Sequence, residues 1–129
     1  MPLSIAEIAF FEAHPSALPI YEAFAQAVGG SWEGVVVRVQ KTQITFSSRY
    51  VFACASFLRA RKKAAMPPVF LTLSLGLPAP IESPRLDGAV EPYPGRWTNH
   101  IVVASVEEID SELLGWASEA RFFADLKGR

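Results

Sequence analysis

The sequence predicts a single α+β domain with the element order ααβββββα and one mainly antiparallel sheet of five strands. Apolar residues recur at helical spacing before residue 30 and after residue 105. Between residues 35 and 104 they instead alternate with polar residues, as in strands. The predicted strands follow one another, mostly with short links, which favours an antiparallel meander with the helices packed on one face.

The overall composition is that of one globular domain. A chain of 129 residues falls within the usual size of a domain, so residues 1–129 are predicted to form one unit. The only cysteine, Cys54, cannot form an intrachain disulfide. The longest uncharged run, Ala64–Ile81, is interrupted by prolines and is too short for a membrane helix. With no signal-peptide pattern at the N-terminus, we expect a cytoplasmic protein with no contact to a membrane.

Two short helices are predicted at the N-terminus. Ser4 and Glu7 have the spacing of a capping box, and Pro15 ends this first helix because the residue before a proline disfavours helical geometry. Pro19 suits the first turn of the second helix, and Gly29–Gly30 ends it. The apolar positions that recur at helical spacing are Ile5, Ile8 and Ala9 in the first helix and Ile20, Phe24, Ala27 and Val28 in the second.

Five strands are predicted after residue 34. Their ranges are Val35–Gln40, Ile44–Phe46, Tyr50–Phe57, Val69–Leu77 and Trp97–Ala104. The alternation is clearest in the fourth strand, where every second residue is leucine. The residues between these leucines therefore lie on the face of the sheet without helices, and they are Thr72, Ser74 and Gly76.

A long connection and one further helix complete the prediction. Pro78–Gly95 holds five of the ten prolines and is expected to be an irregular loop. Ser105 and Glu108 have capping-box spacing and are predicted to open the last helix. Its apolar stripe, expected to be buried, is Ile109, Leu113, Trp116, Ala117, Ala120, Phe123 and Ala124. Three apolar residues fall outside that stripe and are candidates for contact with a partner, namely Leu114, Phe122 and Leu126.

The charges are sorted by segment. Residues 1–33 hold four acids and no base, residues 34–81 hold seven bases and no acid, and residues 82–129 hold nine acids and five bases. The net charge of −1 therefore hides a basic middle segment. Such a segment either presents a cationic surface to an anionic partner or pairs with its own acidic flanks, and the sequence leaves both open.

Seven residues form the predicted ligand site. The cations would neutralise an anion, and the hydroxyl, amide and imidazole groups would orient it. These residues are Lys41, Thr42, Gln43, Arg85, Arg96, Thr98 and His100. Six of them have a structural alternative: Lys41–Gln43 as a polar turn, Arg85 and Arg96 as clamps of the long loop, and His100 as a hydrogen-bonded strand residue.

Other functional motifs are absent or weak. The sequence has no phosphate-binding loop, dinucleotide fingerprint, zinc-protease motif, paired-cysteine motif or nucleophile elbow, so no cofactor, metal ligand or catalytic residue is predicted. The densest basic cluster lies within Arg59–Lys63. It is a candidate for weak contact with nucleic acid, although a solvated loop is the more ordinary interpretation.

Several phrases of the sequence occur together in one known family. They are Lys41–Phe46, Ser83–Arg85, Glu91–Trp97 and Arg96–His100, followed by Glu108–Asp110 leading to Trp116 and Ala120. In this combination the chain, over nearly its whole length, resembles a small bacterial family catalogued as domain of unknown function 5655. The resemblance implies a compact α+β domain of mostly bacterial, cytoplasmic proteins and brings no activity with it. In related sequences a second histidine occupies the position of Asn99, so a paired-histidine site is not expected here.

These observations favour a non-catalytic binding module with a cationic, polar groove for a phosphate- or carboxylate-bearing ligand. The alternative is a protein-interaction or homodimerisation module that buries the open sheet face and binds no small ligand. A third interpretation, an enzyme with His100 as general base, has the least support in the sequence.

Overall fold

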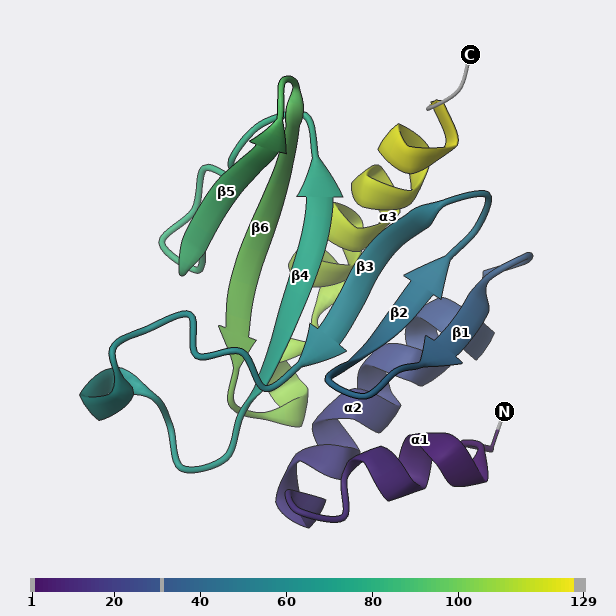
Figure 1. Cartoon of the computed structure of the whole chain (residues 1–129), viewed down its shortest axis with the longest axis vertical. Coiled ribbons are helices and arrows are strands. Elements are labelled where there is room, and N and C mark those ends of the chain that lie inside the picture. The colour runs from purple at the N-terminus through teal and green to yellow at the C-terminus, as the bar shows by residue number, and fades with distance from the viewer. Residues whose placement is uncertain (1, 31, 127–129) are drawn as a thin grey trace.

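The protein consists of a six-stranded sheet with two helices on one face and a third helix at its edge (Figure 1). The structure is a computed structural model that describes residues 2–30 and 32–126. The helices are α1 (Ile5–Phe10), α2 (Leu18–Ala25) and α3 (Ser111–Leu126). The strands are β1 (Val36–Val39), β2 (Gln43–Ser47), β3 (Val51–Ser56), β4 (Leu71–Leu77), β5 (Gly88–Tyr93) and β6 (Arg96–Val103).

All neighbouring strands are antiparallel, in the order β1-β2-β3-β4-β6-β5. The α+β class and the antiparallel sheet are therefore confirmed, including the antiparallel pairing of the Leu71–Leu77 strand with the strand from Arg96. In Figure 1, α2 and α3 lie behind the sheet, as predicted, whereas α1 lies below β1. The prediction of five strands is wrong, because a sixth strand forms within Pro78–Gly95.

The additional strand, β5, forms because its partner strand lies next to it after a tight turn. Gly95 has a φ of 82°, which only glycine adopts readily, and it lets the chain reverse from β5 into β6. The pairing then places Gly88 opposite His100 and Val90 opposite Thr98. The register shifts between Val90 and Tyr93, around Pro92. Because β5 is an edge strand, a proline there costs little, and a sequence that looked irregular forms a strand.

The first helix begins as predicted but buries a different side. The amide of Glu7 donates to the Ser4 hydroxyl, and the amide of Ser4 donates to the Glu7 carboxylate, which completes the capping box. Ile5, however, is 88% exposed, whereas Glu7 is 8% exposed and accepts a hydrogen bond from the Tyr21 hydroxyl. α1 therefore packs through Glu7 and Phe10 rather than through its isoleucines.

The second helix follows the prediction closely. Pro19 lies in its first turn, and Ile20, Phe24 and Val28 are buried. The chain continues from α2 into a single π-helical turn, Gln26–Gly30, which ends at the predicted pair of glycines.

The last helix begins later than predicted. Residues Val106–Glu108 form a short 3₁₀ turn, and α3 starts at Ser111. The Glu108 carboxylate does accept a hydrogen bond from the Ser105 hydroxyl, but it does not open a helix. Instead the Asp110 carboxylate accepts a hydrogen bond from the Leu113 amide three residues later, as an N-cap residue does.

The core lies between the sheet and the helices. The leucines of β4 pack in one cluster with Leu113, Ala117, Ala120 and Ala124 of α3, so the predicted stripe is largely confirmed. Trp116 is a correction: it is only partly buried, because its ring lies at the margin of the core beneath the guanidinium of Arg85. None of the helices in the described part of the chain is both long enough and apolar enough to span a membrane.

Candidate functional site

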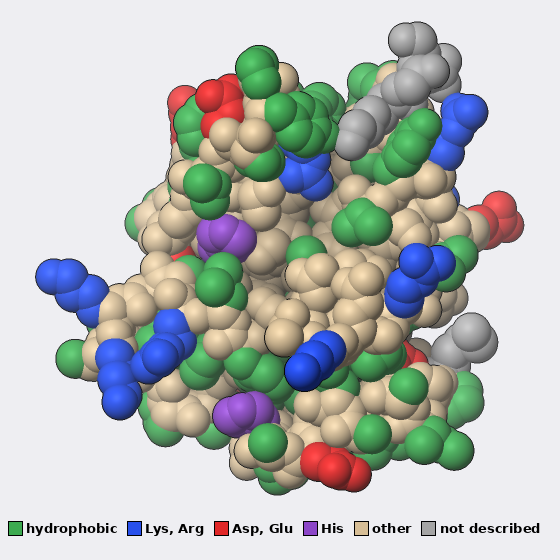
Figure 2. Space-filling model, in the orientation of Figure 1, with side chains coloured by type: hydrophobic (Ala, Val, Ile, Leu, Met, Phe, Trp, Pro, Cys, Tyr) green, Lys and Arg blue, Asp and Glu red, His purple; other side chains and the backbone are tan. Residues whose placement is uncertain are grey.

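The sheet face opposite α3 is the one that faces the viewer in Figures 1 and 2. Thr72, Ser74 and Gly76 of β4 point to this face, as the sequence predicts, but all three are buried. The Thr72 hydroxyl donates to the carbonyl of Leu58 at 2.6 Å, Ser74 lies against His100, and Gly76 lies beneath Arg96. Side chains of neighbouring strands and of the loop after β3 therefore cover the middle of this face.

A groove of about 580 Å³ opens on this face. Five of the seven predicted site residues line it, and they come from the β1–β2 turn and from β6: Lys41, Thr42, Gln43, Thr98 and His100. Ser56, Ser74 and Cys54 contribute from the strands between them. We call this cavity the polar groove. Both histidines of the chain line it, and both are visible on the face shown in Figure 2.

The strand register explains how distant residues meet here. Cys54, Ser74 and His100 are direct cross-strand partners, so they form one row across β3, β4 and β6. The β1–β2 turn approaches from the other side of the groove. It is closed by a hydrogen bond from the Gln40 amide to the Gln43 carbonyl at 2.8 Å, which presents Lys41 and Thr42 at its tip.

His100 is held in place by Ser74. The Ser74 hydroxyl lies 2.8 Å from His100 Nδ1. Burial lowers the pKa of His100 below the usual value for histidine, because the protein solvates the imidazolium less well than water does. At neutral pH the ring is therefore uncharged, and it can offer an oriented hydrogen bond but not a positive charge.

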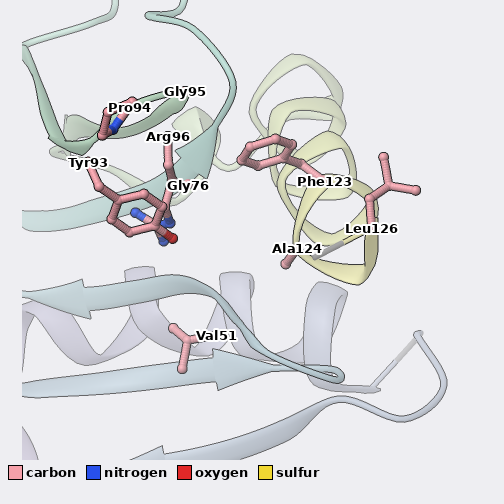
Figure 3. A pocket seen from close by; sticks show the side chains of 9 residues that line it. All are labelled: Val51, Gly76, Tyr93, Pro94, Gly95, Arg96, Phe123, Ala124 and Leu126. Carbon is pink, nitrogen blue, oxygen red and sulfur yellow. The ribbon is translucent and has the colours of Figure 1, made fainter. Parts of the chain in front are cut away.

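Arg96 lines a second pocket (Figure 3) and contacts the polar groove through Thr98. Its Nη1 donates to the Thr98 hydroxyl oxygen at 2.9 Å, and its guanidinium carbon lies 6.0 Å from the centre of the Tyr93 ring. Because the Thr98 oxygen accepts from Arg96, its own hydrogen can donate into the groove. Arg96 itself lines the second pocket, so the structure places it next to the other predicted residues but not among them.

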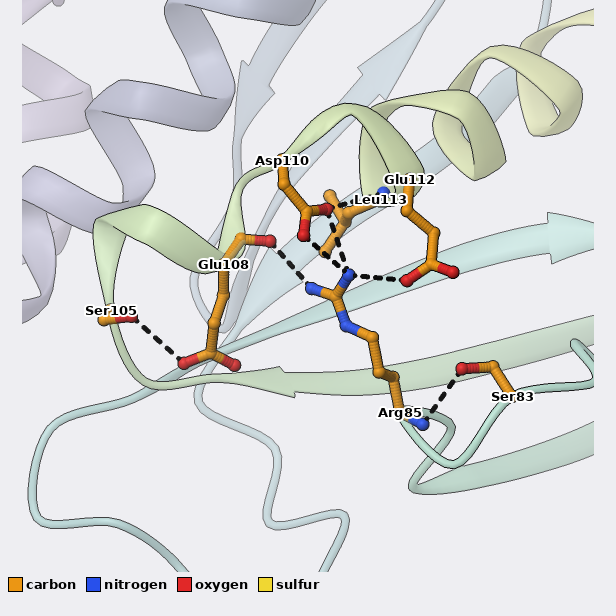
Figure 4. A network of polar contacts seen from close by, with 7 residues as sticks. All are labelled: Ser83, Arg85, Ser105, Glu108, Asp110, Glu112 and Leu113. Atoms are coloured by element: carbon orange, nitrogen blue, oxygen red, sulfur yellow. Dashed lines mark hydrogen bonds and ion pairs between the residues drawn. The ribbon is translucent and has the colours of Figure 1, made fainter.

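Arg85 does not join the other site residues, and the expectation that it would converge with them is wrong. Its Nη1 donates to Asp110 at 3.0 Å and to Glu112 at 2.9 Å, and its Nη2 donates to the carbonyl of Glu108 at 2.8 Å (Figure 4). The guanidinium carbon also lies 5.5 Å from the centre of the Trp116 ring. Arg85 thus clamps the β4–β5 connection to the start of α3, the structural alternative that the sequence left open.

The polar groove is cationic at its rim and aromatic on one wall. No aspartate or glutamate of the described chain lines it, and Lys41 is exposed without an ion-pair partner among the described residues. Phe10 and Phe57 stack with their ring centres 5.8 Å apart, and the His14 ring lies 4.3 Å from that of Phe57. The groove therefore combines one cation, several hydroxyl groups and an aromatic wall.

The basic middle segment remains largely unpaired. Of its seven bases, only Arg61 forms an ion pair with a described acid, through a contact of 2.7 Å to Asp87. The sequence left open that the basic segment pairs with its acidic flanks. In the structure, such an ion pair to a described acid forms at one of the seven bases. The other bases contribute to a positive potential on this part of the molecule.

The only cysteine of the chain, Cys54, lines the groove. Burial raises the pKa of the Cys54 thiol, an effect that the positive charge of Arg96 only partly opposes. A thiol in this state is a poor nucleophile. Within residues 2–30 and 32–126, no group of three metal-ligating side chains is close enough together to hold a metal ion.

Some groove residues were missed at the level of sequence. Ser74 was assigned to the correct face, but its contact with His100 depends on β4 pairing with β6, which is not a local property. Phe10 and Phe57 were missed because the sequence places one in the first helix and the other at the end of a strand. Only the tertiary structure brings these two segments together. The period-2 alternation of β4 and β6 carried a usable signal, since it places Ser74 on the open face and Thr98 and His100 together on one face.

Comparisons with known proteins identify a family and assign no activity. No curated protein and no solved structure matches the chain significantly. One family model, described as Domain of unknown function (DUF5655), matches residues 7–121. This match covers most of the chain and all six strands, and it includes the residues of the polar groove. The chain therefore belongs to the DUF5655 family.

Proposed function

We propose that the protein is a non-catalytic binding module that holds a small phosphate- or carboxylate-bearing ligand in the polar groove. The observation that carries this proposal is the meeting of Lys41, Thr42 and Gln43 with Thr98 and His100 in one cavity. These two groups are more than fifty residues apart in the sequence, so local geometry does not bring them together. A cavity of about 580 Å³ also falls within the usual range for small-molecule sites.

Each lining group has a role in this proposal. Lys41 supplies the positive charge at the rim, and the hydroxyl groups of Thr42 and Thr98 donate hydrogen bonds to the anion. His100, uncharged at neutral pH and positioned by Ser74, orients a second polar group of the ligand. Phe10 and Phe57, which line the groove, offer apolar surface to the body of the ligand.

Calorimetric titration at low salt tests the proposal with inorganic phosphate, citrate and adenosine monophosphate. A single charge pair at about 4 Å in water contributes about 1 kcal/mol, so Lys41→Ala is expected to weaken binding about fivefold. Added salt should weaken binding as well, because ions screen exposed charges. The matched control is Arg49→Ala, which removes an exposed base that does not line the groove.

Three results would speak against the polar groove. Absence of binding to all three anions would refute the proposal. An equal loss of affinity in Lys41→Ala and Arg49→Ala would indicate only non-specific electrostatic attraction. Tighter binding of an oligonucleotide that is weakened by Lys62→Ala and Lys63→Ala would instead indicate a nucleic-acid surface at the basic loop.

A protein-interaction or homodimerisation module is the second candidate function. It is favoured by apolar side chains that α3 leaves in solvent, since Phe122 is 68% and Leu126 is 45% exposed. Sedimentation equilibrium tests it: Phe122→Ser should weaken self-association, whereas Ile5→Ser, at a comparably exposed apolar position of α1, should not. A protein that stays monomeric at high concentration would exclude the homodimer.

A further inference from the structure

A second pocket, which we call the Arg96 pocket, lies where the β5–β6 turn meets the end of α3 (Figure 3). Its volume is about 210 Å³. Tyr93 and Arg96 lie on one side of it, and Phe123 and Leu126 lie on the other side, with Val51 of β3 below. The Arg96 pocket is separate from the polar groove, so a ligand in it would be additional to the proposed function.

The walls of the Arg96 pocket are apolar, and its lining contains one charged residue. Val51 is 45% exposed, Tyr93 43% and Leu126 45%, so each of them has apolar surface still open to solvent. Arg96 is the only ionised side chain at neutral pH among the described residues that line the pocket. A single cation surrounded by apolar surface favours an anion that carries an apolar body over a small, fully hydrated anion.

Arg96 still has hydrogen-bonding capacity. A guanidinium has five N–H donors, and the described residues provide one hydrogen-bond acceptor, the hydroxyl oxygen of Thr98. No carboxylate of the described residues forms an ion pair with Arg96. The planar, forked arrangement of the remaining donors matches the two oxygens of a carboxylate.

Gly76 makes this position of Arg96 possible. A Cβ atom at residue 76 would lie 2.5 Å from Nη2 of Arg96 and 2.8 Å from its guanidinium carbon, closer than such atoms approach. The glycine is therefore required for space, not for an unusual backbone angle. A Cβ atom at position 76 would therefore require the guanidinium to shift from its present place over β4.

From these contacts we infer that the Arg96 pocket binds the carboxylate of a small organic acid with an aliphatic or aromatic body. The carboxylate pairs with the Arg96 guanidinium, and the body packs between Tyr93 and the α3 side chains Phe123 and Leu126. The ligand class is a hydrophobic monocarboxylate.

A homologous series of sodium salts tests this assignment, with binding followed by the NMR amide shifts of Gly76 and Gly95. Each added methylene that enters an apolar pocket contributes about 0.8 kcal/mol, so affinity should rise about fourfold per methylene from acetate through butanoate to hexanoate until the pocket is full. Hexanol, which has the same chain but no charge, should bind at least tenfold more weakly than hexanoate.

Variants separate the two contributions. Arg96→Ala should weaken hexanoate binding tenfold or more, and Gly76→Ala should have a similar effect by displacing the guanidinium without removing it. Phe123→Ala should weaken binding several-fold, whereas Phe122→Ala, its exposed neighbour outside this pocket, should not. If Arg96→Ala proves unstable, Gly76→Ala and the comparison with hexanol still decide the question.

The outcomes also distinguish this pocket from the polar groove. Affinity that does not increase with chain length, or hexanoate binding unaffected by Gly76→Ala and Arg96→Ala, would overturn the assignment. Phosphate binding that depends on Lys41 would leave the polar groove intact in that case. Conversely, hexanoate binding that depends on Arg96 but not on Lys41 would support the Arg96 pocket even if the polar groove bound nothing.

Discussion

The buried pair of Glu7 and Tyr21 offers the sharpest test of how α1 is attached to the rest of the protein. Tyr21 is fully buried, and Glu7 is 8% exposed. One carboxylate oxygen of Glu7 accepts the amide of Ser4, and the other accepts the Tyr21 hydroxyl. Burial raises the pKa of Tyr21, and the adjacent carboxylate raises it further, so the phenol remains a donor at all moderate pH values.

The structure sets the size of the effect of Glu7→Ala. Loss of a capping contact costs about 1 kcal/mol, and a buried hydroxyl left without an acceptor costs about 1–3 kcal/mol. Glu7→Ala is therefore expected to lower the free energy of unfolding by about 2–4 kcal/mol. In a Tyr21→Phe background the hydroxyl is already absent, so the same change should cost only about 1 kcal/mol.

Urea unfolding of the four proteins in this double-mutant cycle, followed by tryptophan fluorescence at pH 7, measures the coupling. Glu22→Ala serves as the control, because Glu22 is an exposed acid on α2 and its loss should change stability by less than about 0.5 kcal/mol. A loss in Glu7→Ala no larger than in Glu22→Ala would refute the role assigned to Glu7. Strict additivity of the Glu7 and Tyr21 substitutions would show that the two side chains do not interact.

Three further predictions concern α3. Gly115→Ala should raise the free energy of unfolding by up to about 1 kcal/mol, since no atom lies within 4 Å of the added methyl group; an unchanged melting temperature would contradict this. Trp116→Ala should cost less than Leu113→Ala, for which about 2–5 kcal/mol is expected, because Trp116 is only partly buried. Asp110→Ala should cost about 1 kcal/mol at pH 7. The Leu113 amide and then Arg85 lower the pKa of Asp110 in the folded protein. The difference in free energy of unfolding between the wild type and Asp110→Ala should therefore shrink below about pH 3.9, where the carboxylate becomes protonated in the unfolded chain.

Much of the fold follows from local properties of the chain. The capping box of Ser4 and Glu7, the proline in the first turn of α2 and the alternating leucines of β4 act within a few residues, and the structure confirms each of them. The two-residue period of a strand likewise placed Thr98 and His100 on one face of β6. Such features can be read from sequence because helix and strand geometry repeat every few residues.

Where local signals conflicted with contacts between distant segments, the distant contacts decided the structure. β5 contains a proline and looks irregular, yet β6 supplies the partner that makes it a strand. The capping box at Ser105 does not open a helix, because Arg85 and Asp110 fix the start of α3 five residues later. Trp116 lies at the margin of the core for the same reason, since Arg85 occupies the space above its ring.

The candidate site shows the same division. Sequence identified the residue types suited to an anion, and in the structure five of the seven predicted residues line one groove, but the sequence could not separate Arg85 from Arg96. Both are arginines that flank the same proline-rich segment, and nothing within a few residues of either tells them apart. In the tertiary structure, Arg85 forms ion pairs with two carboxylates. Arg96 instead packs over Gly76, donates a hydrogen bond to Thr98 and lines a pocket. The chemistry available to a side chain depends on the groups that folding brings near it, and those groups lie far away in the sequence.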